Sequence, residues 1–295
     1  MATFQLKCPD IPVKLPDGLS EERLLAFSPF NNWLKTLNHS LSLQRSSAAH
    51  PFHSDPYALR SITIQSFDLF GAQQQQQRLG FLKLVAEVSN GAGEKLPGSV
   101  FLRGPSVAML VMLIPDDVAP SPVGQHREGE EDRYVVLTVQ PRIPAASLAF
   151  VELPAGMVDD DGSFAGAAAR EIREELGLEI PAAELRCLSD MAAEGMVADD
   201  KNGGSGDGDD EGLPAAMYPS AGGCDEHIPI YMHERRVPRA QLAEWTGKLT
   251  GLRDDGEKIT LKLVRMRDLW REGGRDAKCL AALALWEGLR REGKL

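Results

Sequence analysis

One short segment, Gly156 to Leu178, constrains the fold and chemistry of this 295-residue chain more than any other. It reads GMVDDDGSFAGAAAREIREELGL, a glycine-bearing loop followed by residues that favour α-helix. Ser163 is suited to cap the start of a helix over 164–176, and Gly177 is suited to end it in the left-handed conformation. The segment therefore predicts a short helix directly after a loop.

Three glutamates occupy one face of that predicted helix. Glu171, Glu174 and Glu175 stand at i, i+3 and i+4, which brings their carboxylates within about one turn of each other. Carboxylates this close repel one another, whereas a hard divalent cation with oxygen ligands makes the same cluster favourable. The cluster predicts a magnesium or manganese site. The alternative is a solvated face on which Arg170 and Glu174 form an ordinary i,i+4 ion pair.

The segment as a whole resembles the signature of the Nudix hydrolases: Gly, five residues, Glu, seven residues, then Arg-Glu-aliphatic-x-Glu-Glu-x-Gly-aliphatic. The positions in register are Gly156, Arg170, Glu171, Ile172, Glu174, Glu175, Gly177 and Leu178. One position differs, because Gly162, preceded by three aspartates at 159–161, replaces the first glutamate. In the family that glutamate mainly supports the loop and helix, so its loss bears on loop geometry more than on metal binding.

Composition and charge exclude several classes of protein. A formal charge of −11 argues against a nucleic-acid binder, and no apolar run approaches the roughly 20 residues that span a bilayer. The four cysteines lack the pairwise spacing of a metal site, so a reducing compartment is the default. MATFQLKCPD has neither a signal-peptide core nor an Arg- and Ser-rich transit composition, so we expect a cytoplasmic protein.

Hydrophobic periodicity predicts a mixed α/β domain. Strands are expected at 61–70, 79–88, 107–114, 134–140, 148–153, 228–233 and 258–264, and further helices at 239–245 and 276–290. Polar inserts interrupt the pattern at 73–77, 121–132 and 199–212, and the last is expected to be disordered, since it lacks the spacing of a calcium loop. Together with the resemblance, this pattern implies an α/β/α Nudix sandwich with a mixed sheet over 101–295. An N-terminal helix and β-hairpin region over 1–100 would serve dimerisation and substrate contacts.

Several other segments are similar to one Nudix branch, the plant-type ADP-sugar diphosphatases. They are FNNWLKTL (30–37), FLRGPSVAML (101–110), TVQPRIPAASLAFVELPAGMVDDD (138–161), YPSAGGCDE (218–226) and TGLRDDGEKI (250–259). The resemblance covers nearly the whole chain apart from the inserts. It implies hydrolysis of the pyrophosphate of ADP-ribose or ADP-glucose to AMP and a sugar phosphate.

The resemblance also implies a set of metal ligands. Glu171 and Glu175 would be the principal ligands, with Glu174 adding a carboxylate and the backbone carbonyl of Ala155 completing the shell. Bridging metal ions neutralise pyrophosphate charge and lower the pKa of bound water, which is the chemistry this hydrolysis requires. Gly156 would permit close approach of the backbone.

Arginines and a second glycine loop would contact the substrate. Arg103 and Arg142 match arginines of the branch, and a guanidinium suits bidentate contact with phosphate oxygens, although each could instead form a surface ion pair. Gly222 and Gly223 would let backbone amides approach the substrate. Glu226 would approach either the metals or the terminal sugar. Cys224 has no basic neighbour except His227 and is interpreted as structural.

In the branch that the chain resembles, the general base comes from a mobile loop after the second half of the sheet and not from the motif helix. Glu257 is the first choice and Asp255 the second, while a plain polar turn before a strand would explain the same residues. The branch is typically homodimeric through its N-terminal region, where Trp33, Leu34 and Leu37 would contact either the partner or the local core.

Two other functions stay open: a catalytically silent nucleotide-binding sensor, suggested by Gly162, and a Nudix hydrolase of dinucleoside polyphosphates or oxidised nucleotides.

Overall fold

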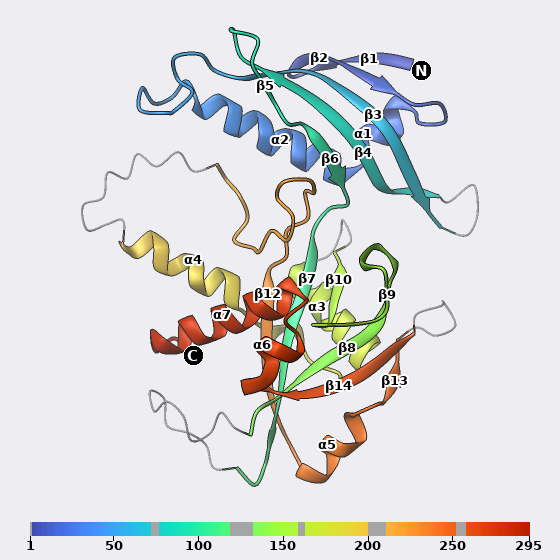
Figure 1. Cartoon of the computed structure of the whole chain (residues 1–295), viewed down its shortest axis with the longest axis vertical. Coiled ribbons are helices and arrows are strands. Elements are labelled where there is room, and N and C mark those ends of the chain that lie inside the picture. The colour runs from blue at the N-terminus through green and yellow to red at the C-terminus, as the bar shows by residue number, and fades with distance from the viewer. Residues whose placement is uncertain (1, 72–76, 119–131, 159–162, 200–210, 252–257) are drawn as a thin grey trace. The chain divides into compact units, whose positions relative to one another are not determined.

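The computed structural model describes residues 2–71, 77–118, 132–158, 163–199, 211–251 and 258–295 (Figure 1). The chain divides into two compact units. The N-terminal unit comprises Met1–Pro105, Ser205–Pro214 and Ser220–Glu226, and the C-terminal unit comprises Ser106–Gly204, Ala215–Pro219 and His227–Leu295. The three inserts expected from the sequence lie almost wholly outside the described residues.

The N-terminal unit combines a sheet with two helices. Its elements are β1 (Ala2–Lys7), β2 (Asp10–Leu15), α1 (Glu21–Leu25), α2 (Ser28–Leu43), β3 (Ala58–Phe70), β4 (Arg78–Ser89), β5 (Lys95–Leu96) and β6 (Ser99–Leu102). The strand order is β1-β2-β3-β4-β5, with β6 pairing β4. β2 and β3 are parallel and the other pairs are antiparallel.

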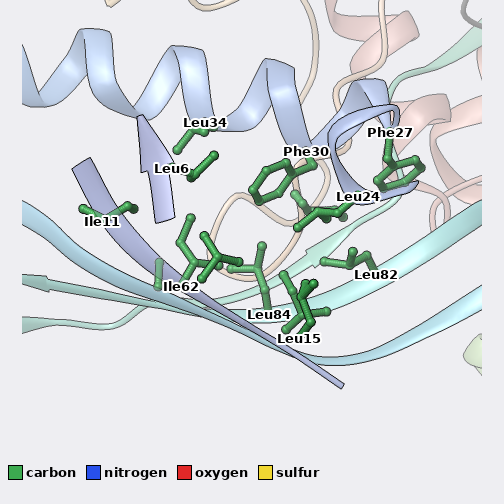
Figure 2. Close-up of a cluster of buried hydrophobic side chains, with 14 of the residues drawn as sticks. Leu6, Ile11, Leu15, Leu24, Phe27, Phe30, Leu34, Ile62, Leu82 and Leu84 are labelled. Carbon is green, nitrogen blue, oxygen red and sulfur yellow. The ribbon is translucent and has the colours of Figure 1, made fainter. Parts of the chain in front are cut away.

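Alternating residues of β3 and β4 form the core of this unit. Ile62, Leu82 and Leu84 are fully buried and pack with Phe30 and Leu34 of α2 (Figure 2). This is the period-2 pattern of a sheet with one covered face. Trp33 and Leu37 also pack against this cluster, so the α2 residues considered for a dimer contact belong, at least in part, to the local core.

The C-terminal unit is built on a larger mixed sheet. Its strands are β7 (Ser106–Pro115), β8 (Tyr134–Arg142), β9 (Ser147–Glu152), β10 (Ala155–Met157), β11 (Arg186–Cys187), β12 (Ile230–Val237), β13 (Leu249–Thr250) and β14 (Ile259–Arg265). Its helices are α3 (Phe164–Glu171), α4 (Leu188–Asp199), α5 (Arg239–Trp245), α6 (Leu269–Glu272) and α7 (Ala277–Arg291). The strand order is β11-β12-β7-β8-β14-β13, with β10 pairing β7 and β9 pairing β8. Only β12 and β7 pair in parallel among the described strands of this sheet.

Strand β7 is buried along its whole length because helices cover both faces of the sheet. Met109 and Val111 face a core shared with α3 and α5, whereas Leu110 and Met112 face a core shared with α4, α6 and α7. Two distinct cores on either side of one strand define an α/β/α sandwich, as the sequence predicted.

Most predicted elements are confirmed, with shifted ends. All seven predicted strands and the helices at 239–245 and 276–290 are present. The β1–β2 hairpin and α4 were not predicted: β1 and β2 are only six residues long each, and α4 has a weak apolar pattern beside an acidic insert. Within the described residues, no helix is long and apolar enough to cross a membrane.

Candidate active site

Strand β10 and the helical segment that begins with α3 carry the motif residues of the candidate site. Ala155 and Gly156 lie in β10, which pairs with the buried strand β7. The hydroxyl of Ser163 accepts a hydrogen bond from the Gly166 amide at 3.0 Å and so caps α3, as predicted. After Glu171, however, the α-helix continues as a π-helix over Ile172–Leu176. The prediction of a regular α-helix to residue 176 is therefore wrong in its last turn, which Gly177 ends at φ 67°.

A π turn over Ile172–Leu176 carries two of the three glutamates, Glu174 and Glu175. A π-helix bonds i to i+5 and so has a wider turn, a geometry often found at functional sites. Glu175 is buried, with only 5% of its surface exposed, and its neighbour Leu176 is also buried. The side chain of Glu174 is 26% exposed and lies 4.0 Å from the Arg173 guanidinium. Glu175 thus faces inwards, while Glu174 is more accessible than the i,i+3,i+4 pattern predicted.

Gly156 is required by the packing of Glu171. A Cβ atom at Gly156 would overlap the carboxyl group of Glu171. The glycine of the sequence signature therefore makes room for one of the predicted metal ligands. Because the overlapping atoms are the end of a flexible side chain, a larger residue would displace the carboxylate more than it would disrupt the fold.

We expect Gly156→Ala to lower kcat at least ~100-fold, a size typical for misplaced catalytic groups, with only a small loss of stability. The measurement is turnover at saturating metal together with a denaturant titration. Gly288→Ala is the matched control, because a Cβ there meets its nearest neighbour at 3.9 Å and should add helix stability without changing turnover. Full activity in Gly156→Ala would show that the Glu171 position does not matter.

The Glu175 carboxyl lies in an unusual environment. One oxygen accepts a hydrogen bond from the Ala155 amide at 3.2 Å, and the other lies 3.4 Å from the Gln140 side-chain nitrogen. Burial raises the pKa of this carboxyl to about 8, and the charges of Glu171 and Glu152 act in the same direction. The Arg142 guanidinium and the Ala155 amide oppose the increase but do not cancel it.

Glu152 is a site residue that the sequence did not reveal. It ends β9, its side chain is 4% exposed, and its carboxylate accepts from Arg142 Nε at 2.6 Å and from Lys278 Nζ at 3.0 Å. Its charge acts on Glu175. The only available signal was an acidic residue at the end of an apolar run, in the stretch LAFVELPAG.

These carboxylates fit a divalent cation by their chemistry. Glu175 and Glu152 are buried, the charge of Glu171 acts on Glu175, and carboxylate oxygens suit a hard ion such as Mg²⁺. As the side chains stand, the described residues form no group of three or more acidic, Cys or His side chains placed to hold one ion. The residues that would hold it are Glu171, Glu175 and the carbonyl of Ala155, with Glu174 at the exposed side.

Arg142 lies next to the acidic residues of the candidate site. Its Nε donates to Glu152, and its side chain is 41% exposed. Among the described residues, neither terminal nitrogen of this guanidinium has a hydrogen-bond partner in the protein. The fork of the guanidinium can therefore receive an anion. Arg142 does form an ion pair, as considered from the sequence. Its partner Glu152 is buried, however, so the pair does not lie wholly at the surface.

Arg103 and Glu226 come together in the N-terminal unit. Arg103 Nη1 lies 3.2 Å from a Glu226 carboxylate oxygen. Asp225, which was not predicted, accepts hydrogen bonds from the backbone amides of Arg103 at 2.8 Å and Gly104 at 3.1 Å. The loop that carries Glu226 is thereby fixed to the strand end that carries Arg103.

Gly222 and Gly223 belong to the same loop. The carbonyl of Gly223 accepts a hydrogen bond from the Phe101 amide at 2.8 Å. A Cβ on either glycine would meet no described protein atom within 4 Å, so packing within the protein does not require glycine at these positions. Burial raises the pKa of the adjacent Cys224 thiol, which keeps it in the unreactive protonated form.

Two predicted residues cannot be placed. The expected general bases, Glu257 and Asp255, lie outside the described residues, as do Gly162 and the aspartates at 159–161. Their roles stay predictions.

Comparisons with known proteins identify the family of this chain. A sequence model of the NUDIX domain matches residues 124–208. The chain is 34% identical over 268 residues to Nudix hydrolase 14, chloroplastic, of Arabidopsis thaliana, an alignment that covers 90% of this chain and 72% of that protein. A solved structure described as an ADP compounds hydrolase has 17% identity and a TM-score of 0.44, covering 81% of this chain and 99% of its own. On the strength of the sequence relationship and the motif residues around Gly156 and Glu175, this chain belongs to the Nudix hydrolase family.

Proposed function

We propose that this Nudix hydrolase is a magnesium-dependent ADP-sugar diphosphatase that cleaves ADP-ribose and ADP-glucose to AMP and a sugar phosphate. The observation that supports it best is the burial of Glu175 beside the charges of Glu171 and Glu152. Like charges gathered out of solvent are unfavourable alone and become favourable around a cation. Nudix hydrolases generally use divalent metal ions, and their family acts on phosphoric anhydrides.

The positions of the chain's own residues support a role for each of them. Bound metal would polarise phosphoryl oxygens and lower the pKa of water. Glu171, Glu175 and the Ala155 carbonyl would hold that metal. The terminal nitrogens of Arg142 would donate hydrogen bonds to a phosphate group. Because the guanidinium is partly exposed and already oriented through Nε, it needs little rearrangement to form two parallel hydrogen bonds.

The remaining assignments rest on the resemblance of the sequence to the ADP-sugar branch. Glu257 acts as general base with Asp255 in reserve, and comparing Glu257→Gln with Asp255→Asn in one assay identifies which of them accepts the proton. Further contacts to the substrate come from Arg103, Gly222, Gly223 and Glu226, with Glu174 assisting at the metal.

Residues 1–100 would serve dimerisation and substrate contacts, and 101–295 catalysis, in a cytoplasmic homodimer. Light scattering tests the dimer, and a fluorescent fusion tests the location, which for the Arabidopsis relative is named as chloroplastic.

A substrate panel tests the activity directly. The purified protein is incubated with Mg²⁺ and, separately, ADP-ribose, ADP-glucose, NADH and diadenosine polyphosphates, while AMP release is followed by chromatography. We expect rapid AMP release from an ADP-sugar and complete loss of release with excess EDTA, restored by added Mg²⁺ or Mn²⁺.

The same panel separates the other two functions. Faster release from diadenosine polyphosphates than from ADP-sugars would replace the proposed substrate class. No release from any compound, together with calorimetric binding of ADP-ribose, would instead indicate a silent nucleotide sensor. Turnover of ADP-sugars that resists chelation would contradict the metal requirement.

A further inference from the structure

Four charged side chains of the C-terminal unit form one linked series. Arg142 Nε donates to Glu152 at 2.6 Å, and Lys278 Nζ donates to Glu152 at 3.0 Å and to Asp276 at 2.9 Å. The side chains of Glu152 and Asp276 are each 4% exposed, that of Lys278 is 12% exposed and that of Arg142 is 41% exposed. Positive and negative groups alternate from the core outwards, and the series ends at the guanidinium beside the acidic residues of the site.

Asp276 fixes the inner end of this series. One carboxylate oxygen accepts from the Lys278 amide at 3.1 Å, which caps the start of α7, and the other accepts from the buried Leu153 amide at 2.9 Å. Burial on its own would lower the pKa of Lys278, but the carboxylates of Asp276 and Glu152 outweigh it and raise that pKa. Lys278 is therefore a charged group with a fixed position, attached to the segment that leads from Glu152 to Ala155.

The contact with Lys278 determines how Glu152 can hold Arg142. A carboxylate with both oxygens available tends to pair with a guanidinium through two parallel hydrogen bonds. Here one Glu152 oxygen accepts from the Lys278 ammonium, which holds it in place, and the other accepts from Arg142 Nε. The terminal nitrogens of Arg142 are thus not used by Glu152, and no other described residue bonds to them.

We propose that Lys278, anchored by Asp276, is a positioning residue that limits Glu152 to a single hydrogen bond with Arg142 and so keeps the Arg142 fork available for a substrate phosphate. This inference rests on the proposed function, because it requires an anionic substrate. Lys278 itself is not a catalytic residue, since it acts on the substrate only through Glu152 and Arg142. Without it, Glu152 would turn its second oxygen to Arg142 and compete with the phosphate.

The test is a double-mutant cycle between Lys278→Met and Arg142→Ala, measured as steady-state hydrolysis of ADP-ribose. We expect Lys278→Met alone to raise KM about tenfold, equivalent to about 1.4 kcal/mol, with kcat changed less than about threefold. In the Arg142→Ala background the same substitution should leave KM unchanged, because the fork through which it acts is gone. A purely structural role would lower activity equally in both backgrounds.

Two further variants keep the test decisive. Lys262→Met removes an exposed lysine that pairs with Glu272 at 2.8 Å, and it should leave KM and kcat unchanged. If Lys278→Met does not fold, Asp276→Asn takes its place. That variant keeps an oxygen to cap α7 but loses the second carboxylate oxygen, so it should raise KM only when Arg142 is present.

The outcomes distinguish this inference from the proposed function. An equal KM effect of Lys278→Met in both backgrounds, or an unchanged KM in the single variant, would overturn the positioning role while leaving the hydrolase intact. Absence of AMP release by the wild-type protein would instead remove the proposed function on which the inference depends. If Lys278→Met changes KM only when Arg142 is present, the result supports both the positioning role and the proposed function.

Discussion

Glu175→Gln is expected to abolish turnover and yet stabilise the metal-free protein at alkaline pH. The variant loses one of the two principal carboxylates proposed to hold the metal, so we expect kcat to fall at least ~1000-fold, by analogy with the loss of other essential catalytic groups. The fold should tolerate the change, because a Gln side-chain oxygen can still accept the Ala155 amide that Glu175 accepts at 3.2 Å.

The stability effect follows from the raised pKa of Glu175. A folded-state pKa of about 8, above the ordinary value of 4.5, means that folding favours the protonated carboxyl. The stabilising contribution is complete below the unfolded-state pKa and is lost as the pH rises through the folded-state pKa. Since a pKa difference of one corresponds to about 1.4 kcal/mol, a chelated sample should lose at least ~2 kcal/mol of stability between pH 5 and pH 9. The Glu175→Gln variant should not show this loss of stability.

Denaturant titrations in EDTA at pH 5 and pH 9, with wild type and variant in parallel, measure this difference. Glu174→Gln is the control for stability, because that side chain is 26% exposed and should not alter the pH dependence. A chelated wild-type protein that is equally stable at both pH values would contradict the assignment of a buried, repelled carboxylate. Wild-type turnover in Glu175→Gln would contradict the metal assignment.

Asp276→Ala should give the largest loss of stability of any single substitution considered for this chain. Its carboxylate caps α7, accepts the buried Leu153 amide at 2.9 Å and neutralises Lys278. Removal leaves a buried donor without a partner and a buried cation with less compensation, so we expect a loss of about 3 kcal/mol or more.

The midpoint of urea unfolding at constant m-value measures this loss. The matched control is Asp268→Ala, because Asp268 also precedes a helix but makes no side-chain cap and pairs with the exposed Arg271 at 2.9 Å. That change should cost less than about 1 kcal/mol. If the two variants unfold at similar urea concentrations, the buried series does not hold the strand and helix together.

The sequence predicted the layered fold well because its signals are local. The apolar run of β7 and the Gly156–Glu175 motif each lie within a short stretch, where periodicity and capping decide the structure. The helix predicted over 164–176 is present as α3 up to Glu171, and its cap at Ser163 was predicted for the same reason. The π turn after Glu171 was not, since its wider spacing depends on which side chains the surrounding core accepts.

The supporting charges could not be predicted, because their partners are distant in sequence. Glu152 and Lys278 are separated by 126 positions, and nothing near either residue indicates the other. The ion pair between Arg103 and Glu226 also joins residues that are distant in sequence. The same is true of the hydrogen bond that Asp225 accepts from the Arg103 amide, 122 positions away. The motif can therefore be recognised from the sequence, whereas the contacts that orient its residues cannot.

The bond between the Leu153 amide and Asp276 also has a consequence for synthesis. The ribosome must add 123 further residues after Leu153 before the carboxylate that binds its amide exists. A nascent chain that has reached only α5 already carries Glu171 and Glu175, but it lacks the partner that holds the strand end at Glu152. Because domains fold as units and this one depends on the contact with Asp276, the acidic residues assume the arrangement described above only after the start of α7 has been synthesised.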